Sequence, residues 1–138
     1  VPARLRFAVV EGGGGAPRLD RGRTGLVLPQ EASLAFRVEV GRPATLVLLR
    51  IGGGEREVVW RGRADHPGAL DVSEGGRPAA YPLRGLAGPQ RFALVASEGA
   101  LEDDDLAAAA RAAADPAASA ADLRSRPLTL DVVEVTVR

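Results

Sequence analysis

The sequence predicts a single antiparallel β-sandwich, Ig-like in a loose sense, over residues 1–138 with one short α-helical insert at about 102–124. Three observations predict this fold. Seven short apolar stretches have the pattern of β-strands, turns rich in Gly and Pro separate them, and an Ala-rich run before the last strand has the pattern of a helix. A chain of 138 residues is long enough to form one hydrophobic core.

The first half of the chain contains the clearest strand patterns. Residues 4–10 and 33–40 alternate apolar and polar side chains, which predicts two half-buried strands. A shorter stretch, Gly25 to Pro29, predicts an edge strand. The glycines at 12–15 predict a loop, and no Gly-Lys-Ser/Thr follows them as it would in a phosphate-binding loop.

The middle of the chain predicts a hairpin followed by short edge strands. Ala44 to Ile51 is almost continuously apolar, as in a central strand that is covered on both faces. After a Gly-rich turn, Arg56 to Arg61 predicts its partner, with Val58 and Trp60 on the buried face. Residues 62–90 are rich in Gly, Pro and Asp, so only short strands and turns are expected there.

The last third combines two long strands with the helical insert. Arg91 to Ser97 predicts a strand, residues 103–114 a helix, and residues 117–123 a second short helix that begins at Asp115-Pro116. Leu128 to Val137 predicts the final strand, but its apolar residues change parity midway. This change predicts either a β-bulge near Val132-Val133 or a strand that is covered on both sides.

Composition restricts the classes of function. The 18 basic and 18 acidic residues give a net charge of zero, which argues against nucleic-acid binding. Every basic residue other than the one His is Arg, and this bias indicates a GC-rich bacterial genome. No Cys is present for a disulfide or a thiolate site. No stretch is apolar enough to span a membrane. The absence of Met indicates either that an initiator was removed ahead of Val1 or that the chain was cut from a longer one, and we expect the second.

Few residues carry the chemistry of a catalytic or metal site. The acidic run Glu102-Asp103-Asp104-Asp105 fits a helix cap better than a Ca²⁺ loop. His66 beside Asp65, with Ser73 or Ser97 as nucleophile, lacks the context of a serine hydrolase. Trp60 is expected in the core or capping an edge rather than stacking on a ligand, and the basic loop is expected to be solvated, with its arginines at Arg18, Arg21 and Arg23. We therefore predict no catalytic, cofactor-binding or metal-ligating residue, and no enzymatic activity.

Three segments carry a resemblance to a known family: residues 34–38, residues 42–49 and residues 88–97. With these motifs the chain, from about Arg4 to Val137, resembles a β-rich domain of unknown function that is common in myxobacteria and related proteobacteria. In that group such domains form the extracytoplasmic end of membrane-anchored regulators, such as zinc-finger anti-sigma factors, or follow caspase-like peptidase and protein kinase domains. Thr45 stands where the group commonly has an aromatic residue. The resemblance implies no functional residues.

Pattern and resemblance together lead to one main hypothesis and two alternatives. The main hypothesis is a non-enzymatic sensing or protein-interaction module of a bacterial regulatory protein, which binds a protein partner through sheet edges and loops and makes no membrane contact of its own. The first alternative is an accessory domain or substrate of a caspase-like protease, cut within residues 19–23. The second is a small β-sandwich hydrolase. The resemblance implies a periplasmic or extracytoplasmic location for the first reading and a cytoplasmic one for the protease-associated reading.

Overall fold

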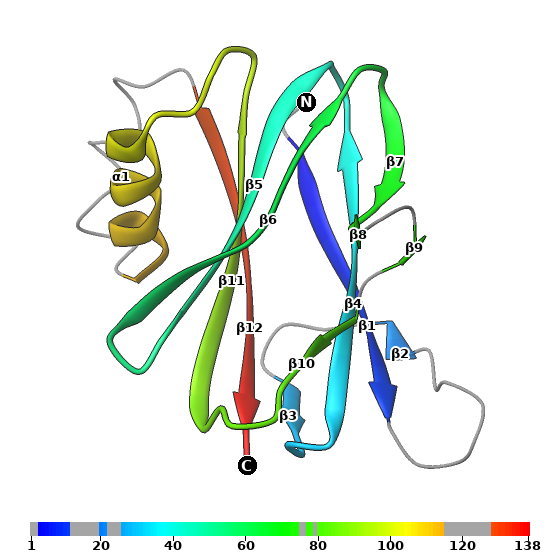
Figure 1. Cartoon of the computed structure of the whole chain (residues 1–138), viewed down its shortest axis with the longest axis vertical. Helices are drawn as coiled ribbons and strands as arrows, with labels where there is room; N and C mark the ends of the chain where they lie inside the picture. The colour runs from blue at the N-terminus through cyan, green and yellow to red at the C-terminus, as the bar shows by residue number, and fades with distance from the viewer. Residues whose placement is uncertain (1–2, 12–19, 22–25, 75–76, 79, 115–127) are drawn as a thin grey trace.

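The described part of the protein is a sandwich of two five-stranded β-sheets with one helix on its outside (Figure 1). This computed structural model describes residues 3–11, 20–21, 26–74, 77–78, 80–114 and 128–138. The predicted mainly β fold, with a short helix before the last strand, is confirmed.

The first sheet, sheet A, is built around two long antiparallel strands. β1 (Arg4–Glu11) pairs with β4 (Ala32–Val40) over its full length. The remaining strands of sheet A are short: β2 (Asp20–Arg21) beside β1, and β7 (Gly68–Asp71) and β10 (Ala80–Pro82) beside β4. The alternation predicted for the two long strands is confirmed, because every second residue of each is buried, as in Leu34, Phe36, Val38 and Val40.

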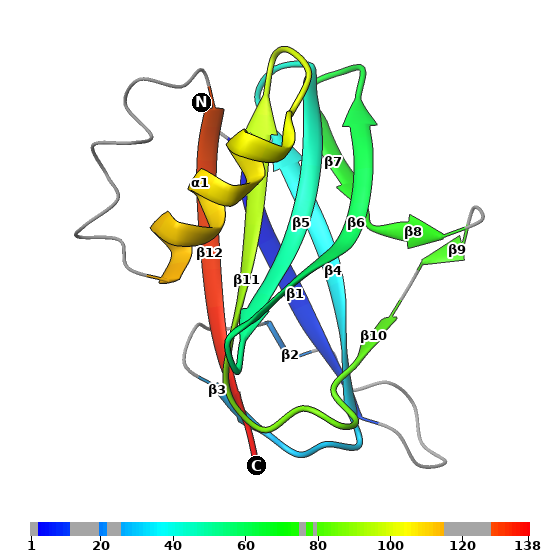
Figure 2. The same cartoon turned by 60° about the vertical axis from the view of Figure 1, so that its left-hand side comes forward.

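The second sheet, sheet B, has the order β3-β12-β11-β5-β6. Its strands are β3 (Leu26–Leu28), β5 (Ala44–Gly52), β6 (Glu55–Ala64), β11 (Gly88–Ser97) and β12 (Leu128–Val137). All neighbours are antiparallel except β3, which runs parallel to β12 and departs from the purely antiparallel prediction. A separate hairpin, β8 (Ser73–Glu74) with β9 (Arg77–Pro78), projects from the region predicted to hold short strands (Figure 2).

The main core lies between the inner faces of the two sheets. Its most buried side chains include Leu34, Leu46, Leu48, Phe92 and Leu94. Four aromatic rings run through it in contact, with centroids 6.4 Å apart for Phe7–Phe36, 5.0 Å for Phe36–Phe92 and 5.6 Å for Phe92–Tyr81. Since Phe92 belongs to sheet B and its neighbours in this chain of rings belong to sheet A, the rings join the two sheets.

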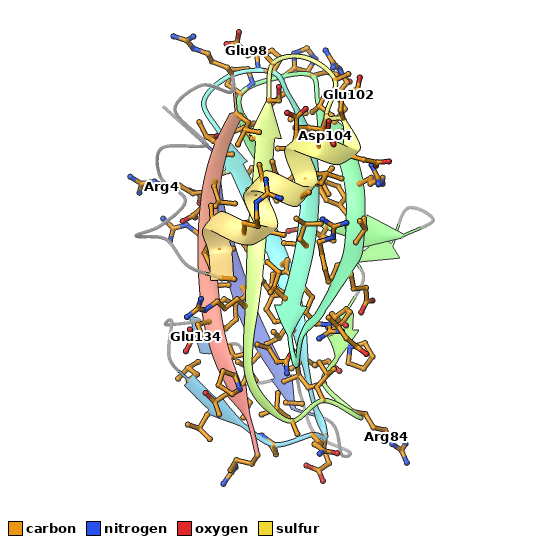
Figure 3. The ribbon with its side chains drawn as sticks, turned by 90° about the vertical axis from the view of Figure 1, so that its left-hand side faces the viewer. Arg4, Arg84, Glu98, Glu102, Asp104 and Glu134 are labelled. Carbon is orange, nitrogen blue, oxygen red and sulfur yellow. The ribbon has the colours of Figure 1, made fainter. Side chains whose placement is uncertain are left out.

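A second apolar cluster covers the outer face of sheet B. The helix α1 (Asp103–Ala114) has the predicted bounds and packs on this face through Leu106, Ala109 and Ala113. Figure 3 shows it lying across the strands, with Asp104 at its N-terminal end. Beneath it lie Val47 and Leu49 of β5 and Ala93 and Val95 of β11. β5 is thus covered on both faces, as its apolar run predicts.

Both ends of α1 are held by side chains. At the start, the Asp105 carboxylate accepts a hydrogen bond from the backbone N–H of Glu102 (3.0 Å), which is half of a capping box and confirms the capping role predicted for the acidic run. At the end, Arg91 of β11 donates to the carbonyl oxygens of Ala113 (2.7 Å) and Ala114, and pairs with Glu134 at 2.9 Å. The predicted helix at 117–123 lies outside the described residues.

The change of parity in β12 results from cover on both sides rather than from a bulge. Its pairing with β11 runs without a register shift from Leu128 to Val137. Leu128, Leu130 and Val132 pack against the cluster under α1, whereas Val133, Val135 and Val137 face the main core. The second of the two predicted alternatives is therefore correct. No helix within the described ranges is long and apolar enough to cross a bilayer.

Candidate interaction surface

A polar cluster joins the two sheets near the turn of the β5–β6 hairpin. The guanidinium of Arg50, with only 5% of its side chain exposed, donates to Glu57 at 3.2 Å and to Gln90 at 2.8 Å. Glu57 also accepts from the hydroxyl of Tyr81, on β10 in sheet A, at 3.0 Å. Burial by itself lowers the pKa of Arg50, but Tyr81 and Glu57 outweigh it, so this pKa lies above its usual value and the group stays charged.

The partners of Arg50 give the cluster a structural role. The guanidinium is occupied by Glu57 and Gln90, with Glu55 at 3.6 Å as a further ion-pair partner. A ligand could reach Arg50 only by displacing these groups. The cluster therefore ties the β5–β6 hairpin to sheet A rather than offering a binding site.

Alkaline titration should isolate Tyr81. Burial raises the pKa of Tyr81 above the usual 10.0; the charge of Arg50 opposes this rise and the hydrogen bond to Glu57 adds to it. The stability linked to this group is therefore complete below about pH 10, the unfolded pKa, and is lost as the pH rises through the folded pKa. Since the chain has no Lys or Cys and one Tyr, tyrosinate absorbance reports Tyr81 alone. We expect a midpoint above 10 in the folded protein and near 10 in urea. Equal midpoints would contradict the burial of the Tyr81 hydroxyl.

A β-bulge in the hairpin decides which side chains of β6 face outward. The register shifts between Leu48, which is opposite Trp60, and Leu49, which is opposite Val58. Val59 is the extra residue, and it packs with Trp60 against the main core. The prediction that Val58 shares the buried face with Trp60 is wrong, because the bulge reverses the parity between them: Val58 is 39% exposed.

The bulge collects the arginines of β6 on one face. Residues directly opposite each other in neighbouring strands point to the same side of a sheet. Arg56 is opposite Ile51, Arg61 opposite Val47, and Arg63 opposite Thr45, and these β5 residues lie on the outer face, where α1 packs. We call this set, Arg56, Val58, Arg61 and Arg63, the arginine face of β6. All four side chains are exposed, and Figure 2 shows β6 at the border of the sheet, to one side of α1.

The free edge of β6 also offers backbone groups. Within the described residues, β5 is the one strand that pairs with β6. The hairpin turn is Gly53-Gly54, both with positive φ (58° and 76°), between the paired residues Gly52 and Glu55. In such a two-residue hairpin, hydrogen-bonded and non-hydrogen-bonded residue pairs alternate along the two strands, starting with a hydrogen-bonded pair beside the turn. Arg56 and Val58 fall in the non-hydrogen-bonded pairs. The backbone N–H and C=O groups of Arg56 and Val58 therefore point away from β5.

The structure places only some of the residues that the sequence offers as candidates for catalysis. His66 is exposed in the loop after β6, and its neighbour Asp65 pairs with Arg63 at 3.3 Å. Ser97 accepts a local hydrogen bond from the N–H of Gly99. Arg21 belongs to β2 rather than to the loop that the sequence predicts. Its side chain, the side chain of Ser73, and the residues Arg18 and Arg23 lie outside what the structure describes. Among the described residues, no three His, Cys, Asp or Glu side chains gather as for a metal ion.

Trp60 has the first of the two roles that the sequence favours, packing against the core. It is partly buried against the main core. Its ring covers Gly62 so closely that a Cβ there would lie 2.2 Å from the ring. The Trp60 ring therefore packs against the core and Gly62 rather than standing free to stack on a ligand.

Comparison with protein-family models, curated proteins and solved structures finds no match for the chain. The class of protein therefore comes from the structure itself: a two-sheet β-sandwich with one helix on its outer face. Its most distinctive surface is the arginine face of β6 beside an unpaired strand edge. The protease-substrate hypothesis stays a prediction, because most of residues 19–23 lies outside the described part of the chain.

Proposed function

We propose that this chain is a non-enzymatic interaction module of a bacterial regulatory protein and that it binds a protein partner by adding a strand to β6. The observation that carries the proposal is the free edge of β6, ten residues long, with outward backbone groups at Arg56 and Val58. The other border strands, β2, β3, β7 and β10, have two to four residues each. Strand addition gains affinity from main-chain hydrogen bonds along such an edge. The resemblance to domains of bacterial regulators supports the same class of function.

A proline at Val58 should block this mode of binding and leave the fold intact. Because the N–H of Val58 points away from β5, Val58→Pro removes no hydrogen bond of the hairpin, whereas it deletes a donor that an added strand needs. The matched control Val58→Thr keeps both the N–H and a β-branched side chain. We expect partner retained by wild type and by Val58→Thr through gel filtration of a lysate from the source cells, and lost with Val58→Pro.

The stability of each variant is measured in parallel by urea unfolding. A partner that stays bound to Val58→Pro, with the fold intact, would refute binding at this edge. If no partner is retained by the wild type, in soluble or in detergent extracts, the proposed function itself fails.

A further inference from the structure

We propose that the strand received by β6 is an extended acidic segment, with carboxylates at alternate positions that meet the arginine face. This inference rests on the proposed function and adds the chemistry of the partner. Three arginines and one valine make up the outer face of β6, and no acidic side chain of β6 shares it. Although the chain has a net charge of zero, this strip of it is positive.

The acidic residues of β6 are separated from its arginines by the sheet itself. Glu57 is opposite Arg50, on the inner face, and both Glu57 and Glu55 pair with that buried guanidinium. The single charge of Arg50 therefore offsets part of their charge from the inner side of the sheet. On the outer face, neither Arg56 nor Arg61 has an ion-pair or hydrogen-bond partner among the described residues, and Arg63 pairs with Asp65 just beyond the strand.

The same pattern argues against a second copy of this chain as the occupant. If two β6 edges paired about a two-fold axis between Val59 and Trp60, Arg56 of one copy would face Arg63 of the other. Like charges that lie directly opposite each other across a strand pair are destabilising. An acidic strand reverses the sign of that interaction. The arginine face thus disfavours self-association and favours an acidic partner, which is how charge sets the specificity of an interface.

Charge should determine which strand binds, while main-chain hydrogen bonds between that strand and β6 supply most of the affinity. Exposed ion pairs are individually weak and are screened by salt. Because Arg63 already pairs with Asp65, the two new pairs are those at Arg56 and Arg61. Together they are expected to change the dissociation constant by up to about tenfold. Binding should accordingly weaken as the salt concentration rises.

Two synthetic peptides test the inference on the whole chain. One has five Thr-Glu repeats and the other five Thr-Gln repeats, so that they share length and β-propensity and differ in charge. We expect the acidic peptide to bind about tenfold more tightly in fluorescence anisotropy, and the difference to shrink at high salt. Equal binding of the two peptides, or no binding of the acidic one, would overturn the inference.

Charge reversal supplies the matched variants. Arg56→Glu/Arg61→Glu should lose its preference for the Thr-Glu peptide and gain one for a peptide of Thr-Arg repeats. The control Arg84→Glu/Arg138→Glu makes the same change of net charge at two other exposed arginines and should keep the acidic preference. Loss of preference in both double variants would show a non-specific charge effect and contradict the inference.

The two proposals can fail separately. If Val58→Pro removes the native partner but the Thr-Glu peptide does not bind, the partner is not acidic and the proposed strand addition stands. If the Thr-Glu peptide binds with the expected preference but the native partner still binds the Val58→Pro variant, the acidic preference stands and the proposed function is wrong.

Discussion

Phe92→Ala should destabilise the protein by about 3–5 kcal/mol, the range for removing a large buried aromatic ring. Phe92 has no exposed surface. The centroid of its ring lies 5.0 Å from that of Phe36 and 5.6 Å from that of Tyr81. Because both neighbours belong to sheet A, the substitution opens a cavity between the sheets and breaks the chain of rings that joins them. The free energy of unfolding, from urea titration followed by Trp60 fluorescence, measures the effect.

The control for this experiment is Arg84→Ala, at an exposed arginine that forms no ion pair among the described residues (Figure 3). A change within about 0.5 kcal/mol is expected there. A cost for Phe92→Ala below about 1 kcal/mol would show that the ring does not connect the sheets.

Gly52→Ala should cost about 1–3 kcal/mol, as overpacking of a filled site does. A Cβ at this position would lie 2.0 Å from the side-chain oxygen of Gln90. Gln90 cannot easily move aside: it is 2% exposed, accepts from Arg50 at 2.8 Å, and donates to the carbonyl of Ala87 at 3.1 Å. The added methyl group must therefore disrupt the hydrogen bond that satisfies a buried guanidinium.

A double-mutant cycle identifies Gln90 as the cause. Once Gln90→Ala has removed the obstructing side chain, adding Gly52→Ala should cost much less than it does in the wild type. The cycle also controls for the difference in intrinsic strand propensity between Gly and Ala, which is the same in both backgrounds. If Gly52→Ala costs the same with and without Gln90, the clash at this site is not what destabilises the variant.

Much of the fold could be predicted because the burial of one face of a strand or helix requires apolar residues at regular intervals in the sequence. Residues 33–40 alternate strictly since one face of β4 meets the core. The helix could be bounded because acidic residues occupy its first turn and Ala fills the rest. The parity change in Leu128 to Val137 left a β-bulge and cover on both sides as alternatives. The structure shows the second, with the core on one side and α1 on the other.

The candidate surface could not be predicted, because it depends on one inserted residue. A strict period of two places Val58 and Trp60 on the same face, and nothing in Val58-Val59-Trp60 indicates which residue is the extra one. The bulge becomes visible only once β5 fixes the register. The polar cluster was missed for a related reason: Arg50 and Gln90 are 40 residues apart in sequence. Arg50 lies near the end of β5 and Gln90 near the start of β11, where solvated polar residues are expected.

The cover that α1 places over sheet B bears on how the chain emerges during synthesis. β5 and β11 carry uninterrupted apolar runs on both faces, the kind of segment that aggregates when it is exposed. The helix follows β11 after a connection of five residues, 98–102, so the segment that protects the outer face is made immediately after the strand that most needs it. Contacts so close in sequence form quickly. The outer layer can therefore close on the nascent sheet before β12 has left the ribosome.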